Sequence, residues 1–337
     1  MSSPGQGGLT KTVIGLAMLA ACGLAVYVAF AQRSAGPAAS SPAGGAAVSV
    51  DELKAAMAKL RPLYQKLGKP QPGDWLTAHR EPGQTFQEYL KSDPVTLGER
   101  RRVIYIQPLG DFTDKQRKIL DLTADFMGRF FNTAVKMNET LPMTVIPSKA
   151  RRTHPTWGDK QILSTSVLDE VLRSRLPKDA FAMIAFTAGD LWPGEGWNFV
   201  FGQASLRDRV GVWSMYRFGD PGQSDQALRL CLLRTMKTAV HETGHMLSIQ
   251  HCTAYECGMC GSNSLPEADR RPLAFCPECM AKVCWAASAP PAERFRKLAA
   301  FCRDNGLKDQ AAFYEKCLAA LSPAPAPSTQ ARKEPEK

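Results

Sequence analysis

Three histidines at fixed spacing constrain this chain more than any other feature. His241 and His245 are four residues apart, so on a helix their side chains share one face and can hold one metal ion. Glu242 stands beside the first histidine, where a general base for a metal-activated water belongs. His251 lies six residues after His245, too far along a continuing helix to reach the same metal. We therefore expect the chain to break and turn back between these two histidines.

The donor set predicts a catalytic zinc site. His241, His245 and His251 supply three imidazoles, which leaves the fourth position of a tetrahedral zinc open for water. In such a site Glu242 takes a proton from the water that attacks a peptide carbonyl, and then passes it to the leaving amine. A His-Glu-x-x-His run also occurs by chance in unrelated helices, but the third histidine and a neighbouring cysteine cluster favour metal binding. We predict a zinc-dependent hydrolase of peptide bonds.

The cysteines gather just after the histidines. Five of the ten fall within 28 residues, which is typical of metal binding rather than of a distributed disulfide framework. Spacing alone favours the CxxC pairs Cys257/Cys260 and Cys276/Cys279, which leaves Cys252 spare. The alternative set replaces Cys260 with Cys252. Either set makes a closed site with four sulfurs, which is typical of structural zinc.

The N-terminal region predicts a membrane segment. Residues 12–31 are uncharged and long enough to span a bilayer as one helix, so we expect residues 1–33 to be a single-pass anchor or a signal segment. Two alternatives stay open, a lipoprotein signal at Cys22 and cleavage after Ala31. Residues 34–48, rich in Gly, Pro, Ala and Ser, predict a flexible linker, and residues 322–337 a disordered tail.

The charge pattern argues against a nucleic-acid partner. Lys and Arg number 42 against 32 acidic residues, a net charge of +10, but no long basic run occurs. Between Cys276 and Trp285, Lys282 is the single basic residue. We therefore expect no nucleic-acid partner. The predicted zinc site implies a peptide or protein substrate, and residues 12–31 imply contact with the membrane. We expect the chain to be a monomer.

Hydrophobic periodicity predicts a mixed α/β sheet. We expect helices at 50–67 (interrupted at Pro62), 85–91, 113–136, 167–176, 224–247, 293–305 and 308–321, of which 224–247 carries the first two histidines. We expect strands at 103–109, 143–146 and 181–187, and a hairpin formed by 197–201 and 210–216.

The full pattern resembles a known family. The chain resembles the archaemetzincins, zinc metallopeptidases of the metzincin clan, over roughly residues 70–320. The resemblance rests on the motif His-Glu-x-x-His-(x)5-His-Cys-(x)4-Cys-x-Met and on a Cys-x-x-Cys downstream of it. The resemblance implies a compact metzincin-like α/β domain, residues 49–321, with a mixed twisted sheet, a long active-site helix and a zinc-knotted C-terminal part. It implies substrate binding along an edge strand, which we place at 197–201. The residues that it implies are His241, His245 and His251 for the catalytic zinc, Glu242 for the base, Cys252, Cys257, Cys276 and Cys279 for a second zinc, and Met259 beneath the metal.

Two features depart from that family. Ser248 stands where metzincins usually have a glycine, at a turn that favours left-handed backbone. The alternative function is therefore a catalytically degenerate, zinc-stabilised binding or scaffold protein. The predicted membrane segment is the second departure, because archaemetzincins are typically soluble.

Overall fold

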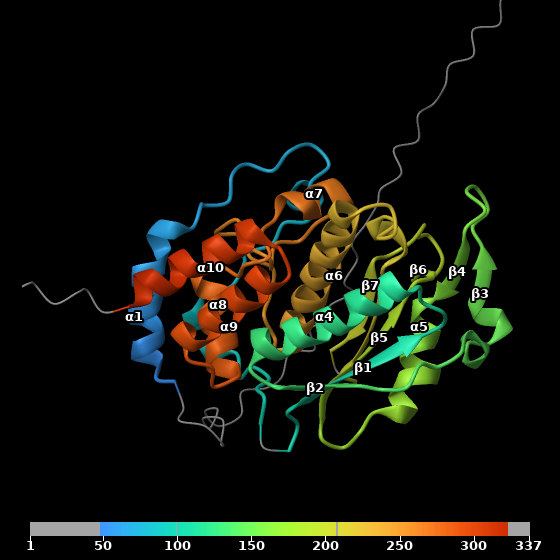
Figure 1. Ribbon diagram of the computed structural model, residues 1–337, viewed down its shortest axis with the longest axis horizontal. Helices are drawn as coiled ribbons and strands as arrows, with labels where there is room; N and C mark the ends of the chain where they lie inside the picture. The colour runs from blue at the N-terminus through green and yellow to red at the C-terminus, as the bar shows by residue number, and fades with distance from the viewer. Residues whose placement is uncertain (1–47, 99, 207, 323–337) are drawn as a thin grey trace, which may run out of the picture.

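The computed structural model describes residues 48–98, 100–206 and 208–322, and a five-stranded sheet lies at its centre (Figure 1). The strand order is β2-β1-β5-β8-β7, with β7 running antiparallel to β8 at one edge and all other pairs parallel. These strands are β1 (Val103–Leu109), β2 (Ala134–Met137), β5 (Ala180–Thr187), β7 (Gly202–Ser205) and β8 (Val210–Ser214). The predicted mixed α/β fold is confirmed.

A second, smaller sheet flanks the first. It has the order β3-β4-β6, with β3 antiparallel and β6 parallel to β4. Its strands are β3 (Arg151–Thr153), β4 (Lys160–Leu163) and β6 (Asp190–Trp192). All three are short, and the sequence analysis predicted none of them.

Most helices lie to one side of the sheets: α1, α8, α9 and α10 are at the left of Figure 1, and β3 and β4 are at its right edge. The α-helices are α1 (Val50–Leu60), α2 (Trp75–Ala78), α3 (Phe86–Lys91), α4 (Asp114–Phe131), α5 (Ser164–Ser166), α6 (Asp225–Met246), α7 (Leu265–Arg270), α8 (Pro277–Ala286), α9 (Pro291–Asp304) and α10 (Lys308–Leu321). Single helical turns are the 3₁₀ segments η1 (Arg61–Leu63), η2 (Met143–Val145), η3 (Ser148–Ala150), η5 (Arg173–Arg175) and η6 (Tyr216–Phe218), and the π-helical η4 (Val167–Leu172).

The apolar sequence of β5 is explained by burial on both faces of the central sheet. Alternate residues of a strand point to opposite faces. Ile184 and Phe186 belong to the core that includes α4 and α6, whereas Met183 and Ala185 belong to a second core with η4. A strand covered on both faces is almost entirely apolar, as in other parallel sheets, and Thr187 at its end is the polar exception in β5.

The long helix α6 places the histidines. Ser224 caps its N-terminus by accepting a hydrogen bond from the Ala227 amide, and 22 residues at 1.5 Å each span roughly 33 Å. The helix packs against α4 beside the central sheet and ends directly after His245. Its predicted span and cap are confirmed.

Several predicted elements differ from the structure. The helix opened by the Thr113 capping box ends at Phe131 instead of Lys136, because Asn132 adopts left-handed backbone (φ +48°) and the chain continues as β2. Residues 143–146, predicted as a strand, form η2. The predicted helix over 167–176 is the π turn η4 followed by η5.

The predicted edge strand is also displaced. Residues 197–201 form no strand, and β7 at Gly202–Ser205 pairs with β8 instead. A single bridge joins Val200 to Leu191 of the smaller sheet, which draws this segment away from the central one. The free edge of the central sheet on this side is therefore β7.

The predicted membrane anchor requires a correction. Within residues 48–98, 100–206 and 208–322 no helix combines the length and the apolar character needed to cross a bilayer, since even α6, the longest, carries Arg229, Arg234 and Lys237. On this finding the predicted transmembrane helix, membrane partner and membrane location are wrong. Residues 12–31, the alternatives at Cys22 and Ala31, the linker residues 34–47 and the tail residues 323–337 lie outside the described residues.

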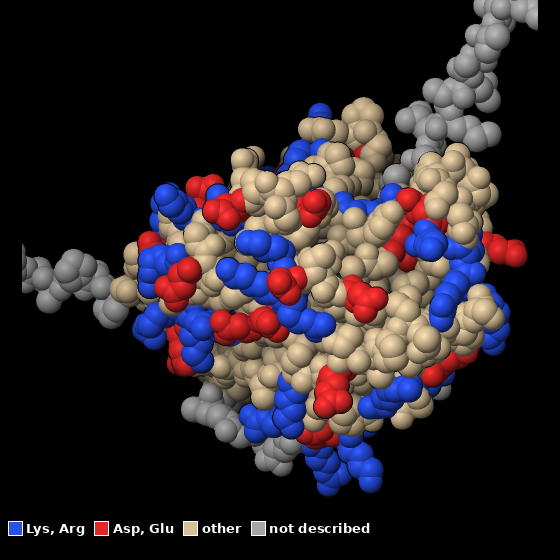
Figure 2. All heavy atoms as spheres, turned by 45° about the vertical axis from the view of Figure 1, so that its right-hand side comes forward, with Lys and Arg blue, Asp and Glu red and all other residues tan. Residues whose placement is uncertain are grey.

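Surface charges of both signs are interspersed on the face in Figure 2. Exposed ion pairs among the described residues include Arg303 with Glu315 at 2.5 Å and Lys297 with Glu293 at 2.6 Å. Exposed pairs of this kind contribute little to stability, at most about 1 kcal/mol each. On the face in Figure 2, neither sign of charge forms a continuous patch.

Candidate metal centre

The end of α6 and the turn after it bring three imidazoles together. The Nε2 atoms of His241 and His245 are 3.1 Å apart, and one donor atom from each of His241, His245 and His251 lies within 4.8 Å of the others. All three residues are buried. A zinc–nitrogen distance of about 2.0–2.1 Å separates two ligand nitrogens by about 3.3 Å, so the cluster has the size that one ion needs.

The other nitrogen of each ring is held by an oxygen. The Nδ1 atom of His241 lies 2.8 Å from Gly258 O, and the Nδ1 atom of His245 lies 2.7 Å from Ile249 O. The Nδ1 atom of His251 lies 3.0 Å from the Glu81 carboxylate. A ring that donates from Nδ1 presents the lone pair of Nε2.

Two buried atoms at this cluster lack partners. The Nε2 of His251 and the Oε2 of Glu242 have no hydrogen-bond partner among the described residues. A buried polar atom without a partner is costly, and a metal ion with its water would satisfy both atoms. Burial also lowers the pKa of His241 to about 3, so this ring is neutral at physiological pH, as a ligand must be. The residues present therefore fit a zinc ion.

Glu242 lies one residue after His241 and is almost completely buried. Burial raises the pKa of its carboxyl to about 8 in the metal-free protein. A cation at the histidine cluster would favour the charged carboxylate and lower this pKa. The carboxyl can therefore exchange a proton near neutral pH.

The turn between His245 and His251 is made at Ser248. Its φ of +65° is left-handed, a conformation that favours glycine. Amides of the turn bond back to the helix end, Ser248 to His245 O at 2.8 Å and Ile249 to Gly244 O at 3.2 Å. The Ser248 hydroxyl accepts a hydrogen bond from the Val95 amide at 3.1 Å, a contact that glycine could not make.

Glu81 was missed by the sequence analysis. Both of its oxygens lie 3.0 Å from Nδ1 of His251, which is 170 positions later in the chain. Burial acts to raise the pKa of Glu81, but the hydrogen bond and charge of His251 outweigh it and lower the pKa overall. No motif surrounds Glu81, so no local signal could have identified it.

A second cluster of donors follows the histidines. The Sγ atoms of Cys252, Cys257, Cys276 and Cys279 are buried and all lie within 4.8 Å of one another. Tetrahedral zinc with Zn–S of about 2.3 Å places its sulfurs about 3.8 Å apart, and Cys252 and Cys276 are 3.6 Å apart. The amides of Met259 and Cys276 point at the Cys257 sulfur (3.4 and 3.1 Å).

The spare cysteine of this region is Cys260. Its thiol points to Tyr255 O at 3.3 Å, and it is not part of the four-sulfur group. All nine cysteines in the described residues are free thiols. Of the two sets that the sequence left open, the geometry brings together the one containing Cys252.

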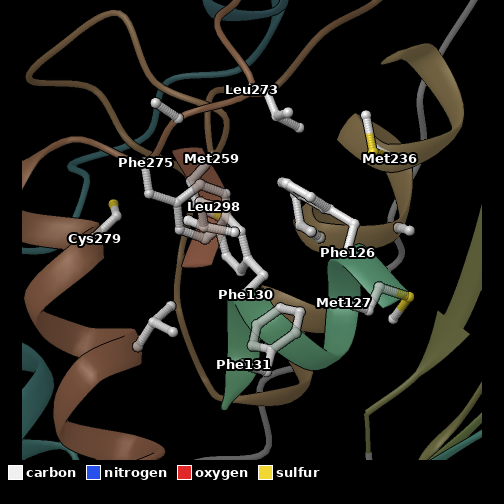
Figure 3. Close-up of a cluster of buried hydrophobic side chains, with 14 of the residues drawn as sticks. Phe126, Met127, Phe130, Phe131, Met236, Met259, Leu273, Phe275, Cys279 and Leu298 are labelled. Atoms are coloured by element: carbon white, nitrogen blue, oxygen red, sulfur yellow. The ribbon is translucent and has the colours of Figure 1, made fainter. Parts of the chain in front are cut away.

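Met259 and Phe275 pack the two clusters against each other. Met259 lies against the α6 backbone between the histidines, since a Cβ added to Gly244 would meet its Sδ at 2.7 Å. Figure 3 shows Met259 beside Phe275, with Phe130 of α4 facing the latter at a ring distance of 4.8 Å. A glycine at 244 thus permits the close approach of the methionine.

Comparison with known proteins shows the same family in each case. Residues 132–284 match the model of "Peptidase family M54". Archaemetzincin-2 of Homo sapiens is 35% identical over 266 residues, which cover 69% of this chain and 73% of that protein. Archaemetzincin of Archaeoglobus fulgidus is 31% identical over 180 residues, 53% of this chain and 98% of that protein.

Solved archaemetzincin structures are also similar to this chain. The structure of the Archaeoglobus fulgidus protein is 30% identical in sequence, with a TM-score of 0.42. The match covers 53% of this chain and 99% of the Archaeoglobus chain. The relationship to the human protein, at 35% identity over 73% of its length, establishes the family. The chain belongs to the archaemetzincins, peptidase family M54, and is a zinc metallopeptidase.

Proposed function

We propose that the chain hydrolyses peptide bonds with Glu242 as general base and with zinc held by His241, His245 and His251. The observation that carries this proposal is the convergence of three imidazoles whose Nδ1 atoms are already held, next to a carboxyl oxygen without a partner. The substrate class is peptide or protein.

Proton transfer is the part that this chain's own residues perform. A zinc ion, when bound, polarises the peptide carbonyl and lowers the pKa of a water. Oε2 of Glu242 accepts the proton of the attacking water and returns it to the leaving amine nitrogen. Because the Glu242 carboxyl is almost completely buried, contact with bulk water is small while it holds that proton.

A second zinc, on Cys252, Cys257, Cys276 and Cys279, would be structural. Four sulfurs fill a tetrahedral site and leave no open position for a substrate. Cys252 directly follows His251, so this second site would fix the position of the third histidine. We propose residues 49–321 as the domain that holds both sites.

The degenerate alternative depends on Ser248. Its hydroxyl bonds to the Val95 amide at 3.1 Å, and its left-handed backbone closes the end of α6. These contacts support a competent turn with serine in place, so we favour the active enzyme.

The test combines metal analysis with peptide hydrolysis by the full chain. We expect two zinc ions per chain and a fall in kcat of at least about a hundredfold in Glu242→Gln. The exposed Glu139→Gln is the matched control and should keep wild-type turnover. One zinc per chain would refute the second site, and undiminished turnover in Glu242→Gln would refute the assigned base.

A further inference from the structure

A row of half-buried polar residues precedes the first histidine on the same face of α6. Arg234, Lys237 and Thr238 are seven, four and three residues before His241, so they share its face. They line one wall of a cavity of about 50 Å³ that reaches both His241 and Glu242.

Apolar side chains and the segment before α8 form the rest of this cavity. Its lining includes Phe201, Phe218, Leu265, Ala268 and Pro272. Side chains of this kind lower the local polarity and strengthen electrostatic interactions along this wall.

Two of the three cations that line the cavity are matched by carboxylates. Arg234 forms a bidentate pair with Asp269 (3.0 and 2.6 Å). Arg271 bonds to Glu256 at 2.8 Å and to Glu267 at 3.1 Å. The two guanidinium groups are therefore neutralised within the protein.

Lys237 is different. Its Nζ donates to two backbone carbonyls, Ala268 O at 3.2 Å and Asp269 O at 3.1 Å, and no carboxylate of the described chain lies within 4.0 Å of it. An ammonium group has three hydrogens, so one is left for the cavity. Burial lowers the pKa of Lys237 to about 8; the Asp269 carboxylate, which Arg234 engages, offsets this only in part, and the charge of Arg234 adds to it.

We propose that Lys237 is a specificity-determining residue, which selects a substrate with an acidic side chain directly after the scissile bond. A carboxylate in the cavity would supply the third hydrogen-bond acceptor and the missing negative charge. The cavity has room for a few water molecules, which a short acidic side chain would displace.

The position of Glu242 indicates on which side of the scissile bond the acidic residue lies. This residue lines the same cavity, and in the proposed reaction it protonates the leaving amine. The residue that carries that amine therefore lies next to the cavity. The inference rests on the proposed function for this orientation.

The experiment uses three peptides that differ only in the residue after the scissile bond, which is Glu, Gln or Leu. The zinc-loaded full chain, Lys237→Gln and the surface control Lys118→Gln are compared by the ratio of kcat/KM for the Glu and Gln peptides. We expect a ratio of about ten or more for the wild type and the control, since a charge-assisted hydrogen bond is replaced by a neutral one. The ratio should fall to about one in Lys237→Gln.

Two results would overturn the proposal. One is a wild-type ratio near one. The other is a Lys237→Gln variant that loses activity equally on all three peptides while its melting temperature falls, because this would mean that Lys237 only holds the carbonyls at the end of α7.

A binding experiment distinguishes failure of this inference from failure of the proposed function. Uncleavable versions of the Glu and Gln peptides, with a reduced scissile bond, are titrated onto wild type and Lys237→Gln. If no peptide is cleaved but wild type binds the Glu version about tenfold more tightly, and the variant does not, the proposed function fails and the selectivity stands. Equal binding of both versions by wild type would refute the role of Lys237.

Discussion

The hydroxyl of Ser248 accepts a hydrogen bond from the backbone amide of Val95 at 3.1 Å, while Ser248 itself adopts a left-handed conformation at φ +65°. The contact joins the turn between the second and third histidines to the segment after α3. It offsets part of the strain that a side chain causes in this conformation, of about 1–2 kcal/mol.

Replacement of Ser248 by glycine should therefore change little. Relief of strain is balanced by loss of the hydrogen bond and by the greater freedom of glycine in the unfolded chain, so we expect the free energy of unfolding to change by less than about 1 kcal/mol. Ser248→Ala keeps the strain and loses the bond, and should be less stable by about 1 kcal/mol. Urea unfolding measures both values.

Peptidase activity of the same variants distinguishes the two proposed functions. An active native site predicts activity within about twofold of wild type in Ser248→Gly. Activity that appears only in Ser248→Gly would show that the native protein has the degenerate site.

Glu81 should act as a positioning residue for His251. Its carboxylate orients the ring and makes Nε2 a stronger donor to a metal, and loss of such a partner typically lowers metal affinity by about 10–100-fold. We expect Glu81→Gln to release zinc to a chromophoric chelator at correspondingly lower chelator concentration, and Glu81→Ala to be affected more strongly. Equal zinc affinity in Glu81→Gln and the control Glu139→Gln would exclude this role.

The two cysteine sets predict different zinc counts. If Cys252 belongs to the four-sulfur site, Cys252→Ser should bind one zinc ion less per chain and unfold at lower temperature, since structural zinc contributes folding free energy. Cys260→Ser should keep the wild-type count, because its thiol points to Tyr255 O. Metal analysis of the two purified variants decides, and the reverse result would assign Cys260 to the site.

The buried carboxyl of Glu242 should make the stability of the metal-free protein depend on pH. Its pKa is about 8 in the folded state, against 4.5 for an exposed glutamate. Between these values the folded state retains a proton that the unfolded chain has released, so this contribution is fully present below pH 4.5 and is lost as pH rises through 8.

Glu242→Gln is neutral at every pH and should escape that loss. After chelation of metal, the variant should be more stable than wild type at pH 8 by something on the order of 3 kcal/mol, and about equal to it at pH 4.5. Urea unfolding at both pH values measures this difference, in which the titration of other groups cancels. A difference that does not vary with pH would contradict the buried, protonated carboxyl.

Local patterns were sufficient for much of the framework. The spacing of His241 and His245 requires a helix, and Ser224 marks where that helix begins, because capping and helical periodicity involve only neighbouring residues. The apolar run of β5 predicts a central strand for the same reason. The break before His251 also follows from the sequence, since a helix cannot bring a residue six positions later to the same point.

Packing decided the rest. Short strands such as β2 and β3 carry too few residues to show a periodicity, and they form because a neighbouring strand satisfies their backbone groups. Glu81 meets His251 across 170 positions, and Lys237 faces a cavity closed by the segment that contains Ala268 and Asp269. The sequence by itself determined which residues could hold zinc. Tertiary structure alone determined which other side chains surround them, because contacts between distant segments depend on how the whole chain packs and not on the spacing of residues along it.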